Sequence, residues 1–117
     1  MVDLSIVIVS WNVRALLRRC LQSVVTDALP SPDDGVVRIG DWKVEILVVD
    51  NASTDGSSEM VRDEFPQIHL IANDENRGFT AANNQGLALS QGRYLLLLNP
   101  DTEIVGDALA AMIGYAQ

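Results

Sequence analysis

The sequence is short of positive charge, of cysteine and of long apolar runs, and each shortage excludes a class of protein. Eight Lys and Arg residues stand against sixteen Asp and Glu residues, so the formal net charge is −8. A protein that binds nucleic acid or anionic lipid through charge needs the opposite balance. The single cysteine, Cys20, allows no internal disulfide and no thiolate metal site. We therefore expect a protein of a reducing cytoplasm that binds polyanions only with the help of a cation.

Apolar residues are plentiful but are not gathered into a membrane span. A span takes roughly 20 consecutive apolar residues, and no such stretch occurs in this sequence. Acidic Asp3 precedes the first apolar run, unlike in a secretory signal. Because 48% of the 117 residues are apolar, the chain can bury a core. We expect residues 1–117 to form one folded domain.

Four short apolar runs have the length of strands. Three of them lack alternating polar residues, which is typical of strands covered by helices on both faces in a parallel sheet. The fourth run, YLLLL, is bounded by Gly92 and by Asn99-Pro100, which favours a strand over a buried helix segment. The four predicted strands are residues 4–9, 44–49, 68–72 and 94–98.

Helical periodicity follows each of these runs. It predicts helices near residues 13–25, 60–65, 80–90 and 106–116, the first capped by Ser10 or Asn12 and the second by Ser53 or Asp55. Strands and helices that alternate in this way predict an α/β fold, with a mostly parallel sheet flanked by helices. The Pro-, Asp- and Gly-rich stretch 26–43 is expected to be a surface insertion, with a small hairpin at residues 36–43.

Polar residues gather where each predicted strand ends. In a parallel sheet the ligand crevice lies at the carboxyl ends of the strands. A single polar loop often serves only to cap a helix, but four polar loops at one edge are typical of a ligand site. The four loops are residues 10–12, 50–55, 73–78 and 99–103.

Asp50 and Asp101 are the acidic candidates for contact with a ligand. The carboxylate of Asp50 accepts hydrogen bonds, so facing a base it would select uracil, thymine or guanine, whose rings carry an N–H. The alternative is that Asp50 binds amides of its own turn. Asp101 lies between Asn99 and Glu103, and oxygen ligands on alternate residues suit Mg²⁺ or Mn²⁺, which would let an acidic protein hold a pyrophosphate. The same residues also have the composition of a turn and a helix cap.

The third loop contributes a cation and a glycine, and the predicted helix after it contributes two asparagines. Arg77 is placed either to touch a pyrophosphate or to pair with its acidic neighbours. Gly78 permits close approach of the backbone to a ligand. Asn83 and Asn84 are poor helix formers inside a predicted helix, and such local misfits are found at functional sites.

Four motifs resemble, in order and spacing, the amino-terminal half of family 2 glycosyltransferases, which have the GT-A fold. The variant is most similar to the rhamnosyltransferase-like branch, where Asn-Pro-Asp replaces the usual Asp-x-Asp. The resemblance implies a truncated Rossmann-like nucleotide-diphospho-sugar transferase fold. The motifs are SIVIVSWN (residues 5–12), ILVVDNASTDG (46–56), NRGFTAANNQG (76–86) and GRYLLLLNPD (92–101).

The resemblance also implies roles for individual residues. Asp50 would contact the imide of a pyrimidine, Arg77 would lie near the phosphates, and Asp101 would bind the divalent cation, Mg²⁺ or Mn²⁺. Because Asn99 replaces the first acidic residue of the usual motif, Asp101 is the expected carboxylate ligand. Ser10 and Asn12 would border the nucleotide, Asn51 and Asp55 would shape the turn after the second strand, and Gly78 and Asn84 would line the floor of the sugar-nucleotide site.

Members of this family are typically much longer, and their acceptor site and general base lie in the carboxyl-terminal half. The resemblance implies inverting transfer of a hexose from a UDP- or dTDP-linked donor to a hydroxyl of a glycan or lipid-linked acceptor. We expect this chain to hold the donor side and to transfer nothing by itself, with its catalytic residues not identified. The expected location is the cytoplasm, at the inner face of the membrane in a full-length protein, and a homodimer is the expected assembly.

The alternative function is a non-catalytic, receiver-like or interaction module of α/β fold, phosphorylated on Asp50. Such a module needs an acidic pair after the first strand and a lysine near the last strand. Here the first strand is followed by Ser10-Trp11-Asn12, and Lys43 is the sole lysine, so the sequence disfavours this alternative.

Overall fold

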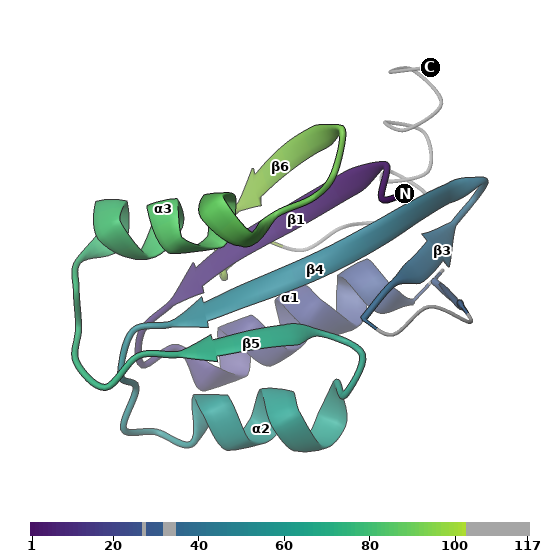
Figure 1. Cartoon of the computed structure of the whole chain (residues 1–117). Coiled ribbons are helices and arrows are strands. Elements are labelled where there is room, and N and C mark those ends of the chain that lie inside the picture. The colour runs from purple at the N-terminus through teal and green to yellow at the C-terminus, as the bar shows by residue number, and fades with distance from the viewer. Residues whose placement is uncertain (27, 32–34, 103–117) are drawn as a thin grey trace.

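The computed structural model describes residues 1–26, 28–31 and 35–102 of the chain (Figure 1). The four predicted strands and the first three predicted helices are all present, which confirms the α/β class. The fourth predicted helix, at residues 106–116, lies outside the described residues. In chain order the elements are β1 (Leu4–Ser10), α1 (Arg14–Val25), β2 (Leu29–Pro30), β3 (Val37–Ile39), β4 (Trp42–Asp50), α2 (Ser57–Glu64), β5 (His69–Ala72), α3 (Phe79–Leu89) and β6 (Tyr94–Leu98).

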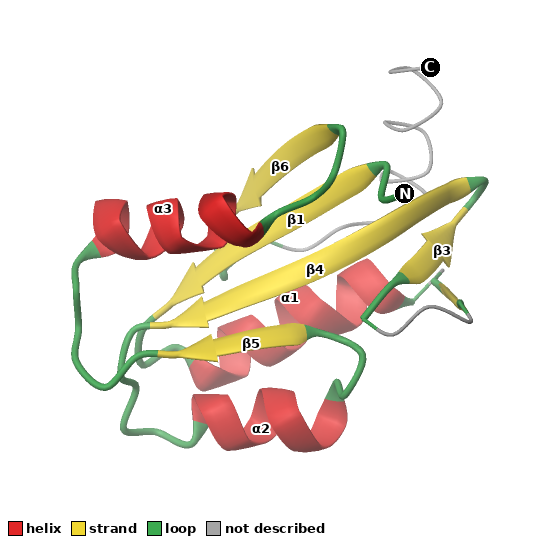
Figure 2. Ribbon diagram, in the orientation of Figure 1, coloured by secondary structure: helices red, strands yellow, loops and turns green. Residues whose placement is uncertain are grey.

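One sheet forms the centre of the molecule, and its longer strands run parallel (Figure 2). β1 pairs with β4 on one side and with β6 on the other, while β5 pairs with the second half of β4. Ser10 and Ala72 both stand opposite Asp50. Because β1, β4 and β5 end at the same level, the loops that follow them meet at one edge of the sheet.

Helices cover the sheet on both faces (Figure 1). On one face, alternate residues such as Ile8 of β1 and Val48 of β4 pack against α1 and α2. On the other face, Val9 and Val49 pack against Ala82 of α3. Every residue of β1 is buried, because the strand is covered from both sides. This explains why its sequence shows no polar alternation. Among the described helices, none is long and apolar enough to cross a membrane.

The stretch expected to be a surface insertion contributes to the sheet instead. β3 and the start of β4 form the predicted hairpin, with Ile39 opposite Trp42 and a turn at Gly40, whose φ is 60°. Val37 and Ile39 are buried in the core on the α1 and α2 face, whereas Arg38 between them is exposed. The alternation of these three residues is a strand signal, in keeping with the predicted hairpin.

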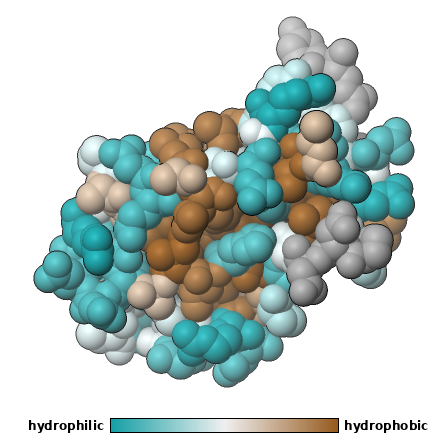
Figure 3. Space-filling view, viewed as in Figure 1, coloured by the Kyte–Doolittle hydropathy of each residue, from teal (hydrophilic) through white to brown (hydrophobic). Residues whose placement is uncertain are grey.

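The α3 face of the sheet is only partly covered. Figure 3 views this face and shows apolar surface gathered on it. Leu95 and Leu97 of β6 stand opposite Ser5 and Val7 of β1 and are 52% and 50% exposed. Within the described residues, β6 pairs with β1 alone. The exposed leucines form an apolar surface beside an edge whose backbone groups are open to pairing with another strand.

Candidate functional site

A cavity of about 530 Å³ opens at the carboxyl edge of the sheet. All four loops singled out in the sequence contribute to its lining. Trp11 follows β1, Asn51 follows β4, Gly78 precedes α3 and Asp101 follows β6. Parallel strands bring these distant segments together, because their carboxyl ends share an edge.

The wall of the cavity is partly apolar and partly polar. Trp11 and Phe79 are 54% and 61% exposed, and Leu16 beside them is 37% exposed. Large exposed apolar side chains around a hollow are typical of a ligand site. The polar side chains of the lining are those of Asn51, Asn76, Asn99 and Asp101.

Asn12 fastens the loop after β1 to the loop after β4. Its backbone N–H donates to the Ser53 hydroxyl at 2.9 Å, and its side-chain oxygen accepts from the Thr54 amide at 2.8 Å. Its φ of 50° is left-handed, a conformation that asparagine adopts more readily than most residues. Ser10 is buried behind this loop, and its hydroxyl has no hydrogen-bond partner within the described part of the chain. Neither residue lines the cavity.

One carboxylate, Asp55, caps two helices. One of its oxygens accepts from the Arg14 amide of α1 at 3.0 Å, and the other accepts from the amide and hydroxyl of Ser57 in α2 at 3.1 and 2.6 Å. Burial raises the pKa of Asp55, but these hydrogen bonds outweigh it and leave the pKa below its usual value. Asp55 accepts from the first amide of α2, although the N-cap residue of that helix is Gly56 rather than the predicted Ser53 or Asp55. The predicted cap of α1 by Ser10 or Asn12 is wrong, because Asp55 reaches α1 from another loop.

Asp50 lies on the α1 and α2 face of the sheet and does not line the cavity. It is 2% exposed, and its oxygens accept from the amide and hydroxyl of Ser53 and from the Ser58 hydroxyl. The structure shows the Asp50 carboxylate bonded within its own turn, and its contact with a ligand stays a prediction. Its carboxylate bonds to Ser53 in its own turn and to Ser58 in α2. Binding within its own turn was the alternative to ligand contact in the sequence analysis. The next residue, Asn51, lines the cavity in its place.

Asn51 joins the loop after β4 to the segment before α3. Its side-chain oxygen accepts from the Arg77 amide at 3.1 Å, and its side-chain nitrogen donates to the Gly78 carbonyl at 3.1 Å. Gly78 has a φ of 82°, and a Cβ there would meet no atom within 4 Å, so the backbone conformation rather than space calls for glycine. Asn51 thereby sets the position of this part of the cavity wall.

Asn99 and Asp101 bring the loop after β6 to the cavity. The Asn99 carbonyl accepts from the Thr102 amide at 3.0 Å, and the Cys20 thiol donates to it at 3.9 Å. Burial and, second, the negative charge of Asp101 raise the pKa of Cys20 to about 11. Among the described residues the one ion pair joins Arg18 and Glu64, so no basic side chain neutralises Asp101.

The oxygen donors of this loop can hold a divalent cation with help from a ligand. Mg²⁺ and Mn²⁺ are commonly bound by one or two carboxylates, with phosphate oxygens and water completing the shell. Asp101 and the Asn99 side chain fit that minimal set. Across residues 1–26, 28–31 and 35–102, no group of three or more His, Cys, Asp or Glu could hold a metal by itself. Glu103, which flanks Asp101 in the sequence, lies outside the described residues.

Two predicted site residues, Arg77 and Asn84, are exposed and are not in the lining of the cavity. Their contacts with a ligand stay predictions. Sequence reasoning gave no role to Trp11 and Phe79, although each lies inside a motif that was singled out. It also missed Gln85, a polar residue that is only half buried in the middle of α3 and bonds to Asn73.

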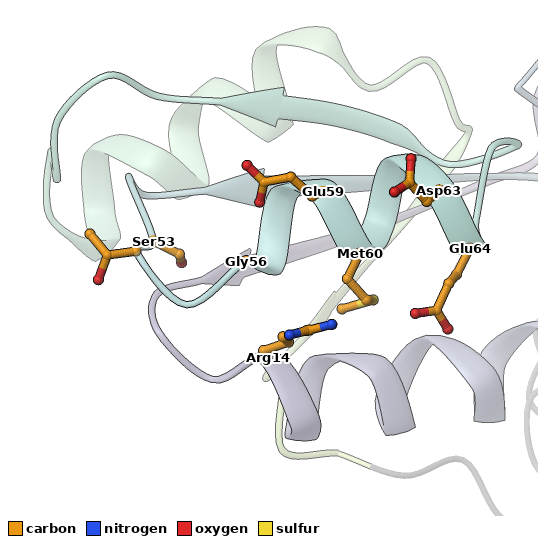
Figure 4. A pocket seen from close by; sticks show the side chains of 8 residues that line it. Arg14, Ser53, Gly56, Glu59, Met60, Asp63 and Glu64 are labelled. Carbon is orange, nitrogen blue, oxygen red and sulfur yellow. The ribbon is translucent and has the colours of Figure 1, made fainter.

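A second hollow, of about 480 Å³, lies between α1 and α2 (Figure 4). Figure 4 shows Arg14 and Glu64 between the two helices. Glu59 and Asp63 also line it, so the lining holds three carboxylates and one arginine and would repel an anion. None of the predicted site residues lines this hollow.

Comparison with known proteins adds a family and relatives. A sequence model described as "Glycosyl transferase family 2" matches residues 5–117. Succinoglycan biosynthesis protein ExoO of Rhizobium meliloti is 30% identical over 115 residues, which is 97% of this chain and 30% of that protein. Glycosyltransferase AglE of Haloferax volcanii is 31% identical over 100 residues, 83% of this chain and 30% of that protein. The chain therefore spans less than a third of each relative.

Solved structures share the fold. TarS 1–349 of S. aureus superposes with a TM-score of 0.77 at 19% identity, over 97% of this chain and 32% of that one. The mannosyltransferase PcManGT of Pyrobaculum calidifontis, solved with GDP-Man and Mn²⁺, superposes with a TM-score of 0.76 at 25% identity, over 95% of this chain and 31% of that one. The sheet with its flanking helices is thus the GT-A arrangement found in glycosyltransferases.

Proposed function

The chain belongs to glycosyltransferase family 2, and on that premise we propose that it forms the donor-binding part of a glycosyltransferase. The observation that carries the proposal is the cavity at the carboxyl edge, which all four motif loops line. Its aromatic wall and its unpaired carboxylate suit a ligand with a ring at one end and phosphates at the other.

The donor that we propose is a uridine or thymidine diphosphate sugar. Trp11 and Phe79 would cover the ring or the sugar, and Gly78 would let the backbone approach it. One side-chain N–H of Asn51 is not used by Gly78 and can donate to a ring carbonyl. Uracil, thymine and guanine carry such a carbonyl, whereas adenine does not. The GDP-Man bound to PcManGT supports a nucleotide sugar as the class of donor.

Around the cavity, we propose two kinds of contribution from the residues identified in the sequence. The first is indirect, because some residues would hold the loops that form the cavity wall without lining it; these are Ser10, Asn12 and Asp50. Arg77, exposed beside Gly78, would reach the phosphates of the bound donor. This division follows from burial, because Ser10 and Asp50 have no exposed surface to offer to a ligand.

We propose that Asp101, with Asn99, holds Mg²⁺ or Mn²⁺ together with the diphosphate. When bound, such an ion neutralises the charge of the diphosphate as it leaves. The Mn²⁺ in PcManGT supports this choice. Asp101 is suited to the role because its charge is not paired within the described residues.

The transfer that we propose is inverting and moves a hexose, as in the rhamnosyltransferase-like branch. An acceptor hydroxyl would bond to the anomeric carbon while the bond from that carbon to the diphosphate oxygen breaks, and a carboxylate would take the hydroxyl proton. We place this base and the site for a glycan or lipid-linked acceptor outside residues 1–117, so the chain alone would bind a donor and transfer nothing. We further propose a cytoplasmic location at the membrane face and a homodimer of this chain.

The receiver-like alternative gains no support from the geometry. Phosphorylation of Asp50 would require its carboxylate to be open to a phosphodonor. The carboxylate is 2% exposed and is bonded to Ser53 and Ser58.

Calorimetric titration of the 117-residue chain with UDP, dTDP, GDP and ADP in the presence of Mn²⁺ tests the proposal. We expect the three nucleotides that carry a ring carbonyl to bind more tightly than ADP. Asp101→Asn should weaken UDP binding about tenfold, the order expected when one charge-assisted contact is lost. Asp74→Asn, a change of an exposed carboxylate outside the cavity, should leave binding unchanged. Tighter binding of ADP than of the other three would contradict the assignment.

A further inference from the structure

A chain of side-chain amides links the middle of α3 to the cavity. Gln85 and Asn73 pair reciprocally, because Gln85 Nε2 donates to Asn73 Oδ1 at 2.9 Å and Asn73 Nδ2 donates to Gln85 Oε1 at 2.8 Å. Asn73 Nδ2 also donates to Asn51 Oδ1 at 3.1 Å. The chain ends at the cavity wall, where Asn51 holds the Arg77 amide and the Gly78 carbonyl.

The backbone at the cavity dictates the orientation of every amide in this chain. The N–H of Arg77 can only donate and the carbonyl of Gly78 can only accept, so Asn51 has to turn its oxygen to the first and its nitrogen to the second. The second lone pair of that oxygen takes a hydrogen of Asn73. The other hydrogen of Asn73 goes to Gln85 Oε1. The Asn73 oxygen then faces Gln85 Nε2 and accepts from it.

We propose that Gln85 is a positioning residue that acts through Asn73 and Asn51 to hold the Arg77–Gly78 segment in the wall of the cavity. Without Gln85, the Asn73 amide loses two of its three side-chain hydrogen bonds and keeps the one to Asn51, whose donor is then less firmly held. A network whose members all have partners is stiffer than one left partly unsatisfied.

Packing of the helix does not explain a glutamine at this position. α3 buries Ala82 and Gly86 against the sheet, and Gln85 is half buried beside them. Leucine would cover the same surface and is at least as good a helix former, but it cannot orient Asn73. That Gln85 fixes the Arg77–Gly78 segment is a claim about the fold alone. The effect of this segment on a ligand rests on the proposed function.

Hydrogen exchange at the Arg77 amide in the 117-residue chain measures the hold directly, because this amide donates to Asn51. We expect Gln85→Leu to speed its exchange about fivefold, the factor that corresponds to loss of one typical hydrogen bond. Gln85→Glu keeps an acceptor for Asn73 Nδ2 and should give a smaller increase. An unchanged exchange rate in Gln85→Leu would overturn the proposal.

Asn83→Leu is the matched control. Asn83 is half buried on the same helix, and its side chain makes no hydrogen bond within the described part of the chain. The Arg77 amide should therefore exchange in this variant as it does in the wild type. If both leucine variants speed exchange equally, helix packing rather than the amide chain is responsible, and the proposal fails.

Titration with UDP and Mn²⁺ supplies the second readout. We expect Gln85→Leu to weaken UDP binding by about threefold to tenfold, as for the loss of about one hydrogen bond, and Asp74→Asn, outside the cavity, to leave it unchanged. Faster exchange with unchanged UDP affinity would show that the position of the Arg77–Gly78 segment does not affect UDP binding. It would overturn the proposed link between Gln85 and the ligand. If the wild-type chain binds no UDP, the proposed function fails, while the exchange rates still decide the role of Gln85.

Discussion

Asp55 places one negative charge against the first amides of two helices, α1 and α2. A charged acceptor at a helix start satisfies amides that have no partner within the helix and also favours the helix dipole. Asp55→Asn keeps the shape of the side chain and removes the charge. We expect it to lower the free energy of unfolding by about 1 to 2 kcal/mol at neutral pH, measured by urea denaturation.

The same residue predicts how this difference depends on pH. Burial raises the pKa of Asp55, but its hydrogen bonds lower it further, so the folded-state pKa lies below the unfolded value of about 3.9. The stabilisation is therefore complete above that unfolded value and is lost as the pH falls through the lower folded-state pKa. The stability gap between wild type and Asp55→Asn should close on acidification. Asp63→Asn, on the exposed side of α2, should have little effect at any pH. A gap that stays constant down to strongly acidic pH would contradict a role for the charge.

At the scale of the elements, α3 lies directly against the sheet at Gly86. A Cβ at this position would lie 2.5 Å from Val7 Cγ1 and 3.4 Å from Val49 Cγ2. Valine side chains on central strands have no flexible end that can move aside, so α3 itself would have to shift. We expect Gly86→Ala to lower the free energy of unfolding by about 1 to 3 kcal/mol in chemical denaturation, although alanine favours helix by about 1 kcal/mol.

Asn84→Ala is the control for this prediction, because it changes an exposed residue of the same helix. Stability should stay the same or rise slightly, since alanine is the better helix former. If Gly86→Ala is as stable as Asn84→Ala, α3 is not held against β1 and β4 as closely as the structure shows.

For the whole molecule, we expect the outer edge of β6, which pairs with no strand among the described residues, to decide how the chain behaves at high concentration. Leu95 and Leu97 are half exposed beside this edge, and unprotected apolar edge strands pair with other chains. We predict that the 117-residue chain associates through β6 and that Leu97→Lys lowers the average mass measured by light scattering. Leu29→Lys changes a leucine of 57% exposure on β2, at the other end of the sheet, and should leave the mass unchanged. Equal effects of both changes would place the association elsewhere.

The motifs predicted much of the candidate site because they sit at strand ends. Asn51, Gly78, Asn99 and Asp101 were all expected near a ligand, and all four line one cavity. The aromatic wall was missed, since one tryptophan and one phenylalanine far apart in sequence carry no signal that they meet. The role of Gln85 was also out of reach, because it depends on a partner twelve positions away across a strand-to-helix connection.

The sequence by itself determined the type and order of the strands and helices, because periodicity and turn residues act over a few positions. It also determined that the polar loops share an edge, since parallel strands end together. Only the tertiary structure decided which of two adjacent residues faces the cavity. Residues 46–49, the part of β4 before this edge, are apolar on both faces, so they do not distinguish one face from the other. Packing of α1 and α2 on one side and α3 on the other places Asp50 with the helices and leaves Asn51 at the cavity.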